Sequence, residues 1–91
     1  MAEVTDNKTA SRFEMAIDGH IAFVAYRWRD GVLSLDHAEV PRELEGRGLG
    51  SALVGATLDA IRAEGLKVVP RCPFIAGFIS RKPEYADMVA H

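Results

Sequence analysis

The chain has 91 residues, of which 48% are hydrophobic and 26% charged, and its formal net charge at pH 7 is -2. These values predict one globular domain over residues 1–91 and argue against a broad electrostatic surface for nucleic acid or for an anionic membrane. A single cysteine excludes an internal disulfide and favours a cytoplasmic location, and no apolar run reaches the roughly 18 residues that a membrane helix needs.

The first half of the chain predicts three antiparallel strands. Residues 1–11 are polar and are expected to be flexible. Alternating apolar residues, or residues that favour β-structure, predict strands over residues 12–17, 20–28 and 32–40. An Asp-Gly pair, a strong signal for a two-residue hairpin, stands at each junction, as Asp18-Gly19 and Asp30-Gly31. The three strands are therefore expected to form an antiparallel meander.

The apolar period changes after a loop at residues 41–45. Helical spacing then predicts an amphipathic helix that ends at Gly65, with a stripe formed by Leu49, Leu53, Val54, Ala56, Leu58, Ala60 and Ile61. Residues 66–69 predict a short buried strand, which the preceding helix allows to run parallel. Residues 74–81 predict a second helix, which ends before Pro83. The expected fold is α/β (mixed α+β), in the order β-β-β-α-β-α.

A glycine-rich loop, Glu45-Gly-Arg-Gly-Leu-Gly50, lies between the third strand and the first helix. Glycines there allow backbone N–H groups to converge on one point, and the helix N-terminus adds roughly half a positive charge. Together they form an anion site suited to a pyrophosphate, to which Arg42 and Arg47 can add charge-assisted hydrogen bonds. On glycine content alone, a flexible loop with a glycine-containing helix cap is an equal alternative.

Two other phosphate-binding motifs are excluded at this loop. The dinucleotide fingerprint requires a glycine where Ser51 stands and a βαβ unit around it, whereas three antiparallel strands are predicted before the loop. A P-loop ends on Gly-Lys-Ser or Gly-Lys-Thr, and this loop does not.

The frame V-P-x-x-x-x-G-R-G-L-G-S-A-L-V, which starts at Val40, resembles the acyl-CoA-binding motif of the GNAT superfamily of N-acetyltransferases. The family pattern is Arg/Gln-x-x-Gly-x-Gly/Ala; Gly48 and Gly50 match its small positions, and Glu45 stands in place of Arg or Gln. The element order over about residues 12–85 also resembles the family core. Short stand-alone members are similar at three further points, here His37-Ala38-Glu39-Val40, Cys72-Pro73-Phe74 and Pro83-Glu84-Tyr85.

The resemblance implies that the chain binds an acyl-CoA, in the first place acetyl-CoA. The strands at 32–40 and 66–69 would diverge, with the pantetheine arm between them, and the glycine-rich loop would hold the pyrophosphate. The implied binding residues are Ala38, Val40, Glu45, Gly46, Arg47, Gly48, Leu49, Gly50, Ser51 and Phe74.

The resemblance also implies direct attack of a neutral amine on the thioester, for which a base is useful. His37 and Glu39 are candidate catalytic bases because alternation places both on one strand face, although a merely solvated face carries the same pattern. Cys72 is a candidate nucleophile that could carry the acyl group, or else a small buried thiol. The general-acid tyrosine of many relatives is replaced by Ser80, and Tyr85 is expected to anchor the end of the chain.

These features predict an acyl-CoA-dependent N-acetyltransferase that acts on an amine of a small molecule or a protein. The alternatives are a non-catalytic coenzyme A-binding or regulatory module, and a small interaction domain whose loop binds nothing. No set of His, Cys, Asp and Glu residues has metal-ligand spacing. Nucleic acid and membrane are not expected partners, and the chain is expected to be a monomer or a homodimer.

Overall fold

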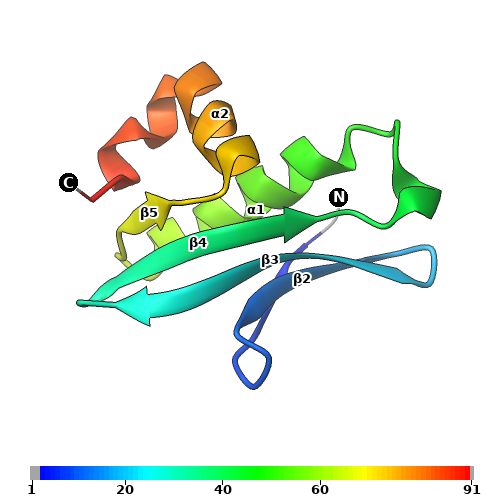
Figure 1. Cartoon of the computed structure of the whole chain (residues 1–91), viewed down its shortest axis with the longest axis horizontal. Helices are drawn as coiled ribbons and strands as arrows, with labels where there is room; N and C mark the ends of the chain where they lie inside the picture. Colours follow the sequence, from blue (N-terminus) through cyan, green and yellow to red (C-terminus); the bar gives the residue numbers. More distant parts are fainter. Residues whose placement is uncertain (1–2, 91) are drawn as a thin grey trace.

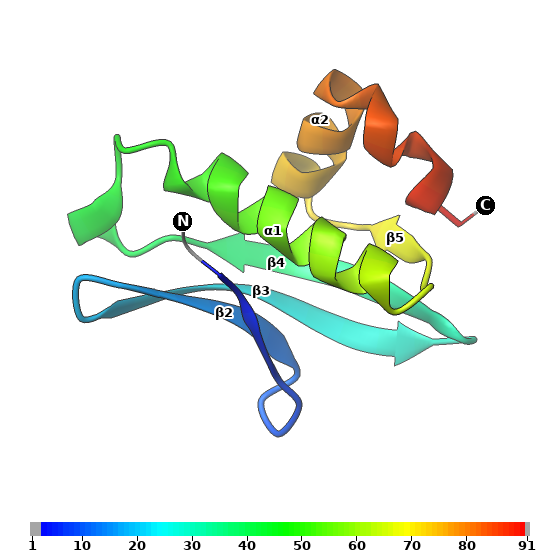
Figure 2. The same ribbon diagram turned by 180° about the vertical axis from the view of Figure 1, so that it is seen from behind.

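The computed structural model describes residues 3–90 and consists of two layers, a twisted sheet and the helices that cover one of its faces (Figures 1 and 2). The sheet has the strand order β1 (Thr5–Asn7), β2 (Arg12–Ile17), β3 (His20–Arg29), β4 (Val32–Glu39) and β5 (Val68–Pro70). The helices are η1 (Arg42–Leu44), α1 (Leu49–Ala63), α2 (Pro73–Arg81) and η2 (Pro83–Met88), of which η1 and η2 are 3₁₀ helices. Within residues 3–90, no helix is long and apolar enough to cross a bilayer.

The expected mixed α+β fold is confirmed. Strands β2, β3 and β4 form the antiparallel meander, and β5 pairs with β4 in parallel after the crossover through α1. Both hairpin turns have two residues with positive φ, 51° and 78° at Asp18 and Gly19, and 52° and 83° at Asp30 and Gly31. This is the type I′ turn, whose twist matches that of the strands on either side.

The core lies between the sheet and the helices. Helix α1 buries Leu53, Val54, Leu58 and Ile61 of the predicted stripe, whereas Leu49, Ala56 and Ala60 are only partly buried. Thr57, which was not predicted, is buried. The Oγ1 atom of Thr57 has no hydrogen-bond partner among the residues that the structure describes. Strand residues that alternate toward α1 and α2 complete the core, namely Phe13, Met15, Ala22, Val24, Tyr26, Leu33 and Leu35.

Strand β1 and the short helix η1, which lies within the predicted loop at residues 41–45, are not predicted from the sequence. Residues 1–11 are expected to be flexible, yet β1 pairs antiparallel with β2 over three positions, while residues 1–2 lie outside the described part. The Tyr26 hydroxyl on β3 donates a hydrogen bond of 2.6 Å to Asp6 Oδ1 on β1. A polar three-residue strand has little apolar pattern, so its position depends on such tertiary contacts rather than on a local signal.

Replacing Tyr26 by Phe is expected to lower the free energy of unfolding at pH 7 by about 1 kcal/mol, the usual contribution of one hydrogen bond. Burial, and then the hydrogen bond to Asp6, raises the pKa of Tyr26 to about 12. An unfolded tyrosine titrates near pH 10, so the wild-type contribution is complete below about pH 10 and is lost as the pH rises toward 12. Denaturant unfolding should therefore show that the difference in the free energy of unfolding between wild type and Tyr26→Phe becomes smaller over this range. A difference that stays constant would contradict the assignment.

Candidate active site

The candidate site begins where β4 and β5 separate. The two strands pair over only three positions, ending at Leu35 and Pro70. The backbone N–H groups of Arg71 and Cys72 then both donate to the Leu35 carbonyl, at 3.0 and 3.1 Å. The chain enters α2 at Pro73, whereas β4 continues to Glu39. Within residues 3–90, the edge of β4 beyond Leu35 therefore has no strand partner on this side, which is the divergence that the resemblance implied.

A β-bulge decides which side chains face this gap. The register between β3 and β4 shifts so that Asp36 is an extra residue on β4. Such an insertion reverses the alternation of side chains along the strand. Leu35, before the bulge, and Ala38 and Val40, after it, consequently all pack on the side of the helices.

The glycine-rich loop gives α1 an open N-terminus. Gly46 and Gly48 have φ values of 83° and 70°, a conformation that costs other residues roughly 1–2 kcal/mol. Gly48 is the N-cap residue of α1, and among the described residues no side chain caps the helix. The first N–H groups of an α-helix have no partner within the helix, so those of Leu49, Gly50 and Ser51 are available to an anion.

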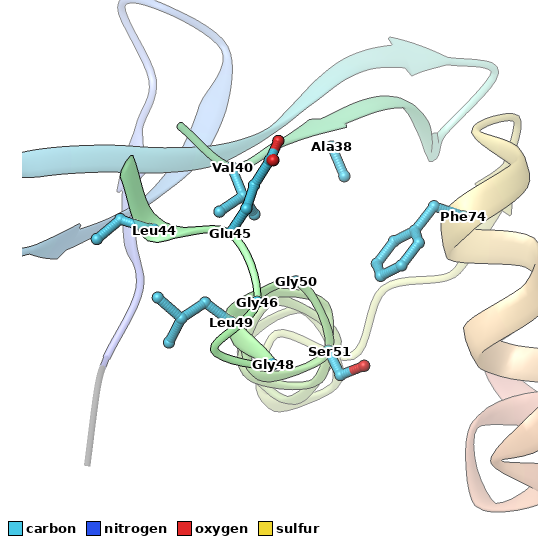
Figure 3. A pocket seen from close by; sticks show the side chains of 10 residues that line it. All are labelled: Ala38, Val40, Leu44, Glu45, Gly46, Gly48, Leu49, Gly50, Ser51 and Phe74. Atoms are coloured by element: carbon cyan, nitrogen blue, oxygen red, sulfur yellow. The ribbon is translucent and has the colours of Figure 1, made fainter. Parts of the chain in front are cut away.

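A pocket of about 340 Å³ lies between the end of β4, this loop and α2 (Figure 3). All the implied binding residues except Arg47 line it, and their side chains come from three separate parts of the chain. The lining also includes Leu44, which the sequence analysis did not single out. Leu44 is an apolar residue among charged neighbours in residues 41–45 and is buried, so its isolation in that loop was the available signal.

Phe74 and Gly50 form a close contact across the pocket. The Phe74 ring extends from the first turn of α2 toward α1 (Figure 3), and it is 45% exposed. A Cβ atom added to Gly50 would lie 3.0 Å from Phe74 Cζ. Gly50 therefore allows the ring to lie against the first turn of α1, where it forms one wall of the pocket.

Charge is unevenly placed around the loop. Glu45 lines the pocket, so a carboxylate stands where the family pattern has Arg or Gln. Arg47 does not line the pocket, and its Nη1 atom instead donates to Asp18 Oδ2, at 2.8 Å, in the β2–β3 turn.

The two candidate bases lie together on the other face of the sheet. His37 Nε2 and Glu39 Oε1 are 3.0 Å apart, and both side chains are 57% exposed. The His37 ring meets the Phe23 ring edge-on, with centroids 6.1 Å apart. Because Ala38 stands between them on the opposite face, the end of β4 presents the pocket on one side and this pair on the other.

Cys72 occupies the point at which β4 and β5 separate. It is the N-cap residue of α2, its side chain is buried in the core, and it does not line the pocket. The structure thus brings His37 and Glu39 together but places the thiol in a different environment.

The expected roles of Ser80 and Tyr85 can be compared with their positions. Ser80 is exposed on α2 and does not line the pocket. The Tyr85 hydroxyl donates to Asp59 Oδ1 at 2.8 Å, and its ring packs against Phe78. Tyr85 therefore anchors η2 to α1, as expected.

Comparison with known proteins agrees with this geometry. Residues 12–88 match the family model described as GCN5-related N-acetyl-transferase. The solution structure of a "GCN5-like putative N-acetyltransferase" from Staphylococcus aureus is similar, with a TM-score of 0.71 and 26% identity, over 97% of this chain and 87% of that one. No curated protein matches the chain. The chain belongs to the GCN5-related N-acetyltransferase family, and this membership supports an acyltransferase function.

The Gly50–Phe74 contact predicts different effects of alanine at two glycines of α1. At Gly55 an added Cβ would lie 3.5 Å from Phe78 Cζ, an ordinary contact, so Gly55→Ala should raise the free energy of unfolding by roughly 0.5–1 kcal/mol. Gly50→Ala should give less than this gain or none, because the Phe74 ring must move. The measurement is the free energy of unfolding in urea of each glycine variant, made both in the wild-type chain and in the Phe74→Ala chain. Equal gains for both variants with Phe74 intact would contradict the contact.

Proposed function

We propose that the protein transfers an acetyl group from acetyl-CoA to an amine. The observation that carries this proposal is the pocket at the open N-terminus of α1, which adjoins the unpaired edge of β4. An anion bound by the loop would lie at one end of the pocket, and a chain extending from it along β4 would reach Ala38 and Val40. A phosphate-bearing carrier with a long thioester arm has this shape.

The residues of the loop would hold the pyrophosphate through main-chain groups. The open N–H groups of Leu49, Gly50 and Ser51 and the partial charge of the helix N-terminus favour an anion there. Glu45 opposes it, since its carboxylate lies in the same pocket. Binding in this protein therefore depends on the backbone more than on the side chain at position 45.

The His37–Glu39 pair would serve the amine. In the transfer, the amine nitrogen bonds to the thioester carbonyl carbon, the carbon–sulfur bond breaks, the amine loses a proton and the thiolate gains one. Glu39 would accept a hydrogen bond from the Nε2–H group of the neutral His37 ring, which would leave Nδ1 as the nitrogen that accepts the amine proton. The amine then approaches from the face of the sheet that the helices leave open. Cys72 is the candidate for a route through an acyl-enzyme, which its burial disfavours.

A non-catalytic coenzyme A-binding module is the second candidate. The positions of Ser80 and Tyr85 favour it, because neither side chain reaches the pocket to protonate a leaving thiolate. Both candidates predict that the protein binds coenzyme A, and only the enzyme predicts turnover of acetyl-CoA.

Calorimetric titration with coenzyme A is expected to detect binding to the wild type and none to Gly48→Val. Valine at Gly48 is strained by the φ of 70° and changes the loop, although the added Cβ itself would meet nothing within 4 Å. Gly31→Val, at φ 83° and likewise in open space, is the matched control and should bind as the wild type does. Absence of heat with the wild type would refute both candidates.

Thiol release from acetyl-CoA, measured with a panel of amines, tests turnover. The proposal expects amine-dependent release that falls by roughly 100-fold or more in His37→Ala, the lower end of the usual contribution of a general base. Turnover in Cys72→Ala should persist, and its loss with intact binding would establish the acyl-enzyme route instead. Binding without release for any amine would support the module.

A further inference from the structure

Arg47 is placed so that it can change partners. It is flanked by Gly46 and Gly48, which both have left-handed conformations. A Cβ atom added to either glycine would meet no other atom within 4 Å, so the loop is loosely packed here. Its guanidinium, which is half exposed, is bonded to Asp18 and does not line the pocket. The loop thus carries its cation away from the pocket whose main-chain groups are open to an anion.

The partner of Arg47 comes from a distant part of the sequence. Asp18 is the first residue of the two-residue β2–β3 turn, and its side chain is 66% exposed. An exposed ion pair of this kind is weak, because water and salt screen both charges. A pyrophosphate binds the forked guanidinium through two parallel hydrogen bonds and, with one negative charge on each phosphate, carries more charge than one carboxylate. Exchange of Asp18 for a phosphate would therefore be favourable.

We propose that Asp18 sets the affinity for acyl-CoA by competing with its phosphate groups for Arg47. This inference rests on the proposed function, since it takes the loop to be the phosphate site. In the free protein the carboxylate holds the guanidinium at the β2–β3 turn. On binding, the guanidinium turns to the phosphates and Asp18 is left to solvent. Asp18 is accordingly a positioning residue, which acts on the ligand only through Arg47.

The fold supplies a matched control for this residue. Asp30 has nearly the same φ as Asp18, 52° against 51°, and also precedes a glycine in a type I′ turn. It lies in the β3–β4 turn, at the other end of β3, and lines a separate hollow with Arg29 and Arg71. Asparagine adopts the left-handed conformation readily, so Asp18→Asn and Asp30→Asn should both retain their turns while each removes one negative charge.

The test is calorimetric titration at low ionic strength with coenzyme A and with pantetheine, which lacks the phosphates. Asp18→Asn should bind coenzyme A about two- to fivefold more tightly than the wild type, the range expected from releasing one exposed ion pair. Its affinity for pantetheine should be unchanged, and Asp30→Asn should match the wild type with both ligands. In an Arg47→Gln background, Asp18→Asn should have no effect on coenzyme A affinity.

The outcomes separate this inference from the function on which it rests. If the wild type does not bind coenzyme A, the proposed function fails and the inference fails with it. If the wild type binds but Asp18→Asn binds equally or more weakly, only the inference is overturned. The same gain in the Arg47→Gln background would also overturn it, because the carboxylate would then act through its field alone. Thermal unfolding of each variant shows whether the fold is retained.

Discussion

The Leu35 carbonyl accepts hydrogen bonds from two successive N–H groups, those of Arg71 and Cys72, and parallel pairing between β4 and β5 ends there. The chain turns away into α2, while β4 continues beside β3 alone. Everything proposed for the site depends on this separation, because it leaves one strand edge open beside the start of α1. The bulge at Asp36 then places small and branched side chains, Ala38 and Val40, on the pocket side of that edge.

The loop that follows β4 also shapes the pocket. Left-handed glycines bring the chain round to an uncapped helix, and Gly50 leaves room for the Phe74 ring to form a wall. Backbone groups thus provide the attraction for an anion, and carboxylates at positions 18 and 45 moderate it.

Sequence reasoning predicts the parts of this structure that depend on local pattern. Alternation and the two Asp-Gly pairs predict the meander, and helical spacing predicts α1 and α2, because these signals come from neighbouring residues. Strand β1 was missed since three polar residues have no period and are positioned by contacts such as Tyr26 with Asp6. The direction of the Arg47 side chain was not predictable either. Its partner Asp18 lies 29 positions earlier in the chain, and the sequence pattern predicts the β2–β3 turn but not where that turn lies relative to the glycine-rich loop.

The central claim is that an anion-bearing ligand binds between the start of α1 and the free edge of β4, and residue-specific NMR during a coenzyme A titration tests it most directly. The account predicts that the amide resonances of Gly46, Gly48 and Ser51 shift most, together with that of Ala38. The amides of the β3–β4 turn, around Gly31, should shift little. Shifts confined to that turn, or an unchanged spectrum at millimolar ligand, would contradict the account.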